Sequence, residues 1–134
     1  MHPRIPTGLL VMSLAALACF APSLAAEPGT LDGSWNGNGK VRFASGSTEA
    51  ARCRATFKQR SPTSFGMIAH CATASAEVNQ TAVLRQDGAN KFTGDFKNSD
   101  YGVTGTITIT VSGNSLTASL SGENGGSGEF RLSK

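Results

Sequence analysis

The stretch Val103-Thr104-Gly105-Thr106-Ile107-Thr108-Ile109-Thr110-Val111 decides the fold, because its apolar and polar side chains alternate without a break. In an extended chain the valines and isoleucines fall on one face and the four threonines on the other. β-Branched residues suit such a pleated, half-buried surface. The stretch therefore predicts a β-strand with one face in a core and the other in water.

The same alternation recurs on both sides of this stretch. Short polar links that contain Gly, Asn or Asp separate the alternating segments and are typical of hairpin loops. The pattern predicts eight strands, at residues 34–44, 48–60, 64–72, 76–86, 91–97, 101–111, 115–121 and 127–133. No segment has a convincing helical period, although residues 73–80 are compatible with a short helical turn.

Eight successive antiparallel strands, each with one apolar face, must shield those faces from water. An open sheet would leave two edges free to aggregate, whereas an up-and-down barrel removes both edges. We therefore predict an all-β, eight-stranded antiparallel barrel, with a two-sheet β-sandwich as the alternative. Glycines at inward positions fit tight coiling, and we expect a side chain there to crowd the opposite wall: Gly37, Gly39, Gly94 and Gly105.

The first 26 residues predict export. Arg4 precedes the apolar run LLVMSLAALACFA, and small residues follow up to Ala25 and Ala26, as in a cleaved secretory signal peptide. The run is shorter than the about 20 apolar residues of a membrane-spanning helix, and a lipid-anchored Cys19 is the less favoured alternative. We expect a signal peptide at 1–26, a single barrel domain at 27–134, no membrane span, and a periplasmic or secreted location in a Gram-negative bacterium.

A barrel of the outer membrane is a further alternative that the composition disfavours. Such barrels carry aromatic girdles at both membrane interfaces. The chain has one Trp and one Tyr, which cannot form two girdles. We therefore expect a barrel with its apolar faces inside.

Two cysteines, Cys53 and Cys71, remain after removal of the signal peptide. In an oxidising compartment they allow a single intramolecular bridge, and they have the same parity on neighbouring predicted strands. The chain-entropy model gives such a bridge about 3 kcal/mol. A metal site is the alternative, but two thiols and His70 make a poor set of ligands. We predict a disulfide, no metal and no cofactor.

Charge is uneven along the chain. The whole sequence has 12 Lys and Arg against 9 Asp and Glu, but six of the basic residues lie between Lys40 and Arg60 with Glu49 as the only acid. A basic outer face attracts polyanions or anionic lipid, and an ordinary solvated surface is the alternative. Four residues are candidates for such surface binding: Lys40, Arg42, Arg52 and Arg54. Nucleic acid is not expected as a partner, because the aromatic side chains nearby have the opposite parity.

No catalytic set stands out. Nucleophilic catalysis needs a nucleophile, a base and an orienting group, and the only histidine after the signal peptide, His70, is expected on the outer face. No phosphate-binding loop, metal-ligand cluster or dinucleotide fingerprint is found. We therefore expect no enzyme but a binding module, whose ligand, partner and oligomeric state the sequence does not name.

Gly33-Ser34-Trp35 opens the first predicted strand and is similar to the Gly-x-Trp signature of the calycin barrels, the lipocalins and their relatives. This resemblance implies that Trp35 plugs one end of the barrel. It also implies that an arginine of the last strand packs across the tryptophan. Arg131 is the matching residue, although strict alternation would turn it outward.

Longer segments, such as GSWNGNGKVRFASG and GDFKNSDYGVTGTITITV, look like a family of small exported proteins of Gram-negative soil bacteria. That resemblance covers nearly the whole chain after the signal peptide and implies fold and export, but no activity. A looser resemblance, to periplasmic metalloprotease inhibitors, implies an inhibitor whose N-terminal trunk, residues 26–31, enters a protease cleft. A third hypothesis is an adaptor that binds a protein or an anionic envelope component through the basic strand face.

Overall fold

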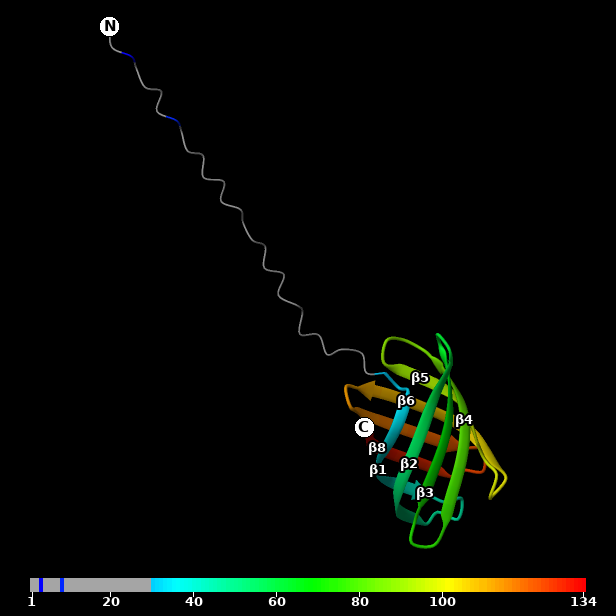
Figure 1. The fold of residues 1–134 in the computed structure, drawn as a ribbon. Helices are drawn as coiled ribbons and strands as arrows, with labels where there is room; N and C mark the ends of the chain where they lie inside the picture. Colours follow the sequence, from blue (N-terminus) through cyan, green and yellow to red (C-terminus); the bar gives the residue numbers. More distant parts are fainter. Residues whose placement is uncertain (1–2, 4–7, 9–29) are drawn as a thin grey trace.

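The computed structural model describes residues 30–134, together with the isolated positions 3 and 8. It contains eight strands, which follow one another round the molecule in chain order (Figure 1): β1 (Gly33–Arg42), β2 (Thr48–Ser61), β3 (Ser64–Ala72), β4 (Glu77–Gln86), β5 (Lys91–Asn98), β6 (Val103–Ser112), β7 (Ser115–Gly122) and β8 (Ser127–Ser133). Every boundary lies within two residues of its predicted position. The predicted signal peptide, which includes Cys19, lies outside the described residues except at positions 3 and 8.

The sheet closes on itself. Each strand pairs antiparallel with its neighbours in sequence, and β8 pairs with β1 from Asn36↔Ser133 to Arg42↔Ser127. The result is a closed eight-stranded antiparallel barrel without free sheet edges. The predicted all-β barrel is confirmed, and the alternative β-sandwich is not formed. In the part of the chain that the structure describes, no helix is long and apolar enough to cross a membrane.

The helical turn considered for residues 73–80 is not formed. The ladder between β3 and β4 extends to the pair Ala72↔Glu77 and leaves only four residues for the link. Thr73 closes that link, since its amide donates to the Ala76 carbonyl at 2.8 Å and its hydroxyl accepts from the Ala76 amide at 3.0 Å. Cross-strand pairing thus decides the conformation of this segment, and the prediction was wrong.

Alternation along the strands places one core inside the barrel. In β6 the side chains of Ile107, Ile109 and Val111 are buried, whereas Thr104 and Thr106 are exposed. The cavity that remains in the interior measures about 20 Å³, which is room for one water molecule at most. The interior is therefore filled with side chains and holds no ligand-sized space.

Inward glycines mark the places where the sheet bends most tightly. A Cβ on Gly94 would lie 2.0 Å from the Val83 carbonyl oxygen, and one on Gly37 would lie 2.1 Å from that of Arg131. Both oxygens belong to the neighbouring strand of the same sheet. The expectation that a side chain would crowd the opposite wall is therefore corrected, because the main conflict is with the backbone next door. Such glycine kinks allow a small barrel to close.

Cys53 and Cys71 are direct register partners on β2 and β3, and they are joined by a disulfide with a sequence separation of 18. Both side chains point into the barrel and are buried. The predicted bridge is confirmed. It ties together two long strands of the barrel wall.

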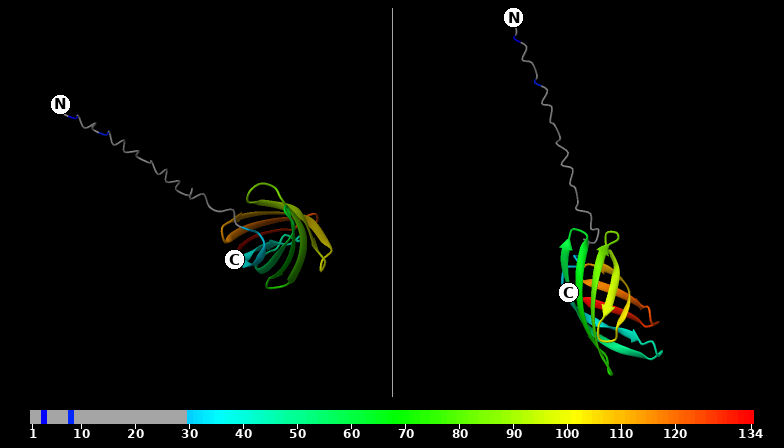
Figure 2. Two further views of the ribbon diagram at one scale, coloured as in Figure 1. Left: turned by 45° about the horizontal axis from the view of Figure 1, so that its top comes forward. Right: turned by 90° about the vertical axis from the view of Figure 1, so that its right-hand side faces the viewer.

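The two ends of the barrel differ. Four loops, at residues 43–47, 73–76, 99–102 and 123–126, meet at one end, and the right-hand view of Figure 2 shows them gathered there. We call this end the mouth. The other end carries two-residue links at 62–63 and 113–114, a four-residue link at 87–90, and the chain segment that enters β1. At one of these links, Gly113 has a φ of 58°, which a two-residue hairpin with a type II′ turn requires at its first position.

Candidate functional site

Trp35 closes the end of the barrel opposite the mouth. Its side chain is completely buried, among the equally buried Leu31, Phe57 and Leu116. The indole Nε1–H donates a hydrogen bond to the Leu31 carbonyl at 2.9 Å, which satisfies its one polar group. Trp35 therefore closes the barrel interior at this end. A hollow of about 550 Å³ lies at the same end and is lined by Leu31, Phe92 and Lys134 among others.

The cation that lies over Trp35 is Lys134 and not Arg131. The Lys134 Nζ is 5.4 Å from the indole ring centroid, within the range of a cation–π interaction. The same ammonium donates hydrogen bonds to the carbonyls of Asp32, at 2.5 Å, and Thr30, at 3.4 Å. Arg131 is exposed on the outer wall, between two inward residues of β8. The expectation of a packed Arg131, which came from the calycin resemblance, is corrected.

The segment that would form an inhibitor trunk is described only at Thr30 and Leu31. Leu31 is 1% exposed and is part of the sealed end. Asp32, the next residue, accepts a hydrogen bond from the Gln59 amide at 2.8 Å. Residues 26–29 lie outside the described residues, so the trunk itself remains a prediction.

The mouth contains the cavity best suited to a small molecule. Its volume is about 560 Å³, within the range of ordinary ligand sites. Its floor consists of buried apolar side chains of three strands, Phe96, Leu120 and Phe130. Half-buried Val41 and Val103 continue this surface towards the rim. The cavity is therefore apolar at its base and open at the loop end.

Polar side chains also line the mouth, among them Arg42, Glu49 and Asn124 and two carboxamides at inward positions of the wall. Gln80 and Asn98 are direct register partners on β4 and β5, and both occupy positions of inward parity. The Asn98 Oδ1 accepts hydrogen bonds from the amides of Asp100, at 3.0 Å, and Tyr101, at 3.3 Å. Asn98 is 5% exposed and Gln80 is half-buried, and both line the cavity. Neither residue was among the predicted site residues, although polar side chains at inward positions were a usable signal.

A chain of hydrogen bonds holds the loop at residues 99–102 against the mouth. The Asp100 carboxylate accepts from the Asn79 Nδ2 at 2.9 Å and from the Asn79 amide at 3.1 Å. The Asn79 Oδ1 in turn lies 2.5 Å from the His70 Nδ1. Tyr101, which is 56% exposed, sits on this loop and lines the cavity. His70 thus supports a loop from the outer face, where alternation had placed it.

The four basic residues predicted for surface binding are all exposed, but the structure does not bring them together as one group. Arg52 and Arg54 line a hollow of about 580 Å³ on the outer wall of β1–β4. Lys40 faces Glu129 across the β1–β8 ladder, which offsets its charge. Arg42 lies at the rim of the mouth. Two of the four therefore remain in a common surface site.

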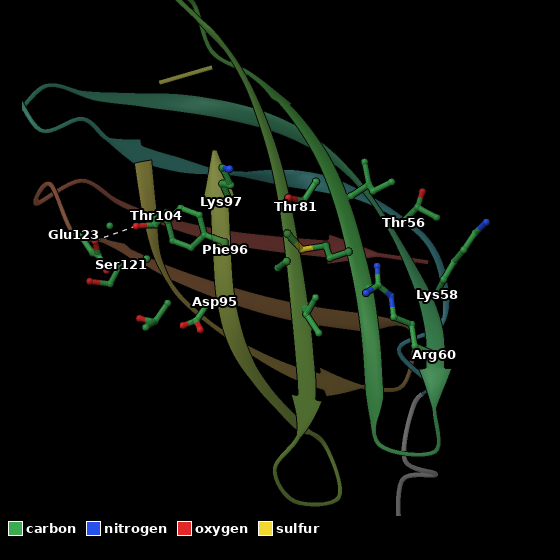
Figure 3. Close-up of a pocket in the computed structure, with 18 of the residues that line it drawn as sticks. Thr56, Lys58, Arg60, Thr81, Asp95, Phe96, Lys97, Thr104, Ser121 and Glu123 are labelled. Atoms are coloured by element: carbon green, nitrogen blue, oxygen red, sulfur yellow. Dashed lines mark hydrogen bonds between the residues drawn. The ribbon is translucent and has the colours of Figure 1, made fainter. Parts of the chain in front are cut away.

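A broader hollow of about 1100 Å³ runs over the outer wall of β2–β7 (Figure 3). Charges of both signs lie along it, among them Lys58, Asp95 and Lys97. The Thr104 hydroxyl and the Glu123 carboxylate are hydrogen-bonded at one side, at 3.0 Å. This surface is wide, solvated and of mixed charge, and it does not single out a ligand. Within residues 30–134 and positions 3 and 8, no group of three His, Cys, Asp or Glu side chains could hold a metal ion.

Comparisons with known proteins agree on the fold alone. No family model and no curated protein matches the chain, so the suggested family of small exported proteins is not confirmed. Among solved structures, the redesigned β-barrels mFAP1 and mFAP0, each bound to DFHBI, resemble it with a TM-score of 0.67. The mFAP1 match has 13% sequence identity and covers 82% of this chain and 100% of mFAP1. The mFAP0 match has 15% sequence identity and covers 78% of this chain and 98% of mFAP0.

A fluorescence-activating β-barrel of de novo design is also similar, with a TM-score of 0.59 and 15% identity over 77% of this chain and 92% of that chain. At these identities the likeness concerns the path of the backbone. The chain therefore has the architecture of small antiparallel barrels that include ligand-binding ones.

Proposed function

We propose that this chain is an exported, non-enzymatic binding module that takes a small, largely apolar molecule into the mouth of its barrel. The observation that carries the proposal is the asymmetry of the two ends. At one end Trp35 closes the interior, whereas at the other a cavity of about 560 Å³ rests directly on the buried core side chains Phe96, Leu120 and Phe130 and has the inward carboxamides Gln80 and Asn98 in its lining. A concave apolar surface with a few polar groups is the usual form of a ligand site.

The filled interior determines where and how such a ligand binds. Because only about 20 Å³ remains inside the barrel, the ligand rests on Phe96, Leu120 and Phe130 and does not enter the core. Burial of apolar ligand surface on this floor supplies affinity. A polar group on the ligand finds hydrogen-bonding partners in Gln80 and Asn98, which orient it. The ligand class is thus a compact, neutral molecule with an apolar body and a hydrogen-bonding edge.

Two further observations support the proposal. The similar barrels mFAP1 and mFAP0 are both bound to DFHBI, so barrels of this architecture can hold a ligand. The disulfide between Cys53 and Cys71 fits an oxidising compartment, in agreement with the predicted signal peptide and a periplasmic or secreted location.

The test is the binding of the neutral dye N-phenylnaphthylamine, whose fluorescence rises in an apolar site. A neutral dye avoids attraction to the basic outer wall. We expect saturable binding that Val103→Asp weakens about tenfold, because a carboxylate in the apolar mouth must lose its hydration. Circular dichroism checks that the variant remains folded.

The matched control is Val83→Asp, the same substitution at a 49% exposed position on the outer wall. This variant should bind the dye as the unmodified protein does. Failure of the unmodified protein to bind would contradict the proposal, and so would equal losses in both valine variants.

A further inference from the structure

Arginines and asparagines alternate across the outer wall of β8, β1 and β2. Asn38 on β1 has Arg131 of β8 on one side and Arg52 of β2 on the other as its direct register partners. One row further along, Asn36 faces Arg54. All five side chains are exposed. Because neighbouring strands lie about 4.8 Å apart, Arg52 and Arg131 flank Asn38 with their Cα atoms about 10 Å apart.

The positive charge of this row is not offset by the residues that face it. The register partners of Arg52 are Asn38 and Ala72, and the second partner of Arg54 is His70. Across the next ladder Arg131 faces Thr117. Glu129 lies two residues before Arg131 on the same outer face, but it has Lys40 as a cross-strand partner. Like charges whose cross-strand partners are uncharged favour the binding of an anion.

Arg52 and Arg54 border a hollow that is lined with amide groups, and Arg131 lies beside it as the register partner of Asn38. Its volume is about 580 Å³, and Asn36, Asn38, Arg52 and Arg54 contribute to its wall. Carboxamides both donate and accept hydrogen bonds, and therefore match the hydroxyl groups of a sugar. Glu77 is the one acidic residue in the lining and lies opposite Ala72, beside the arginine row. The hollow thus combines groups that bind carboxylates with groups that bind hydroxyls.

We propose that this outer wall binds an acidic polysaccharide, with Arg52, Arg54 and Arg131 on its carboxylates and Asn36 and Asn38 on its hydroxyls. Arginine suits this task because its planar guanidinium can bind a carboxylate through two hydrogen bonds. A membrane surface is less well matched. The large exposed hydrophobic side chains Ile68, Val83 and Tyr101 line two other hollows and offer nothing to insert beside the arginines.

The site is independent of the mouth. The arginine row and the amide-lined hollow lie on the outer face of the barrel wall, and neither Arg52, Arg54 nor Arg131 lines the mouth cavity. A variant in the row should therefore leave binding of the neutral dye unchanged, so that failure of one proposal can be told from failure of the other.

The experiment is calorimetric titration of the purified protein with an alginate oligomer, a polyuronate, at low salt. We expect Arg52→Gln combined with Arg131→Gln to weaken binding roughly tenfold to hundredfold, since each lost arginine removes charge-assisted hydrogen bonds. Glu77→Gln should strengthen binding, because it removes the one carboxylate from the lining of the hollow. Affinity should fall as salt is added.

Lys58→Gln combined with Lys97→Gln is the matched control. It lowers the net charge by the same amount at a different hollow and should leave alginate binding within about twofold. Equal losses in both double variants would overturn the proposal in favour of a net-charge effect. Equal binding of a neutral dextran oligomer would also overturn it, as would absence of alginate binding or binding only to phosphatidylglycerol vesicles.

Discussion

Trp35 shows how one side chain gives the barrel a sealed end. The indole is buried completely, and its nitrogen is satisfied by the carbonyl of Leu31, four residues earlier. That hydrogen bond draws the entering chain across the barrel opening. Lys134, at the far end of the sequence, lies on the ring and binds the same entering segment. The two ends of the described domain are thus held together at one aromatic side chain.

This arrangement predicts that substitutions of Lys134 and Arg131, the two cations considered as partners of Trp35, change the free energy of unfolding by different amounts. Lys134→Ala should lower the free energy of unfolding by about 1 kcal/mol, because it removes a cation–π contact and the hydrogen bonds to the entering segment. Arg131→Ala should change it by less than about 0.5 kcal/mol, since its side chain is exposed. Urea unfolding followed by circular dichroism measures both. Trp35 is the single tryptophan, so its emission should respond to the lysine variant alone. The reverse order of effects would restore Arg131 as the packing residue.

Local alternation was enough to predict which side chains enter the core, but not which polar groups meet at the ends. Arg131 was chosen by resemblance, and its own parity already argued against it. Lys134 could not be found in this way, because it follows the last strand and only the closure of the barrel brings it to Trp35. Asn98 could have been found, since it continues the inward series of Phe92 and Phe96 with a polar residue.

Inward glycines contribute to the tight coiling of the strands as much as the β-branched residues do. At Gly94 the neighbouring strand β4 approaches so closely that its Val83 carbonyl occupies the place of a side chain. A methyl group there would have to separate β4 from β5. The glycine is therefore a structural requirement of this corner of the barrel.

We expect Gly94→Ala to destabilise the protein by about 2 kcal/mol, as is usual for overpacking in a tight core. The matched control is Gly66→Ala on β3, where the added methyl would meet only the flexible end of the Arg60 side chain. This variant should be neutral or slightly stabilising, because glycine weakens a strand. Thermal unfolding of the two variants measures the difference. Equal stability of both would contradict the role given to Gly94.

The strands themselves could be predicted because each carries its own signal. Turn residues separate the segments, and the period of two persists within them, as in β6. The same parity argument identified Cys53 and Cys71 as partners. Residues 73–80 were misjudged because the ladder between β3 and β4, a long-range interaction, extends into them. The positions of the inward glycines were predicted from the sequence. That a side chain there would meet the backbone of the neighbouring strand could be seen only from the register of the strands.

The whole molecule is a filled barrel with unlike ends and unlike outer faces. Side chains fill its interior, so a ligand binds at the surface and not in the core. The mouth has an apolar floor with two inward carboxamides, and the wall of β8, β1 and β2 carries arginines whose cross-strand partners are uncharged. Neither feature belongs to one strand, and both arise where strands distant in sequence meet. The sequence therefore predicts the barrel better than it predicts the sites.

A nuclear magnetic resonance titration of the uniformly ¹⁵N-labelled protein with N-phenylnaphthylamine tests the central claim most directly. We predict shift changes at the Gln80 and Asn98 side-chain amides and at the backbone amides of Leu120 and Phe130, with the Trp35 indole signal unmoved. Changes centred on the sealed end or on the outer wall, or no change at saturating dye, would contradict a binding mouth.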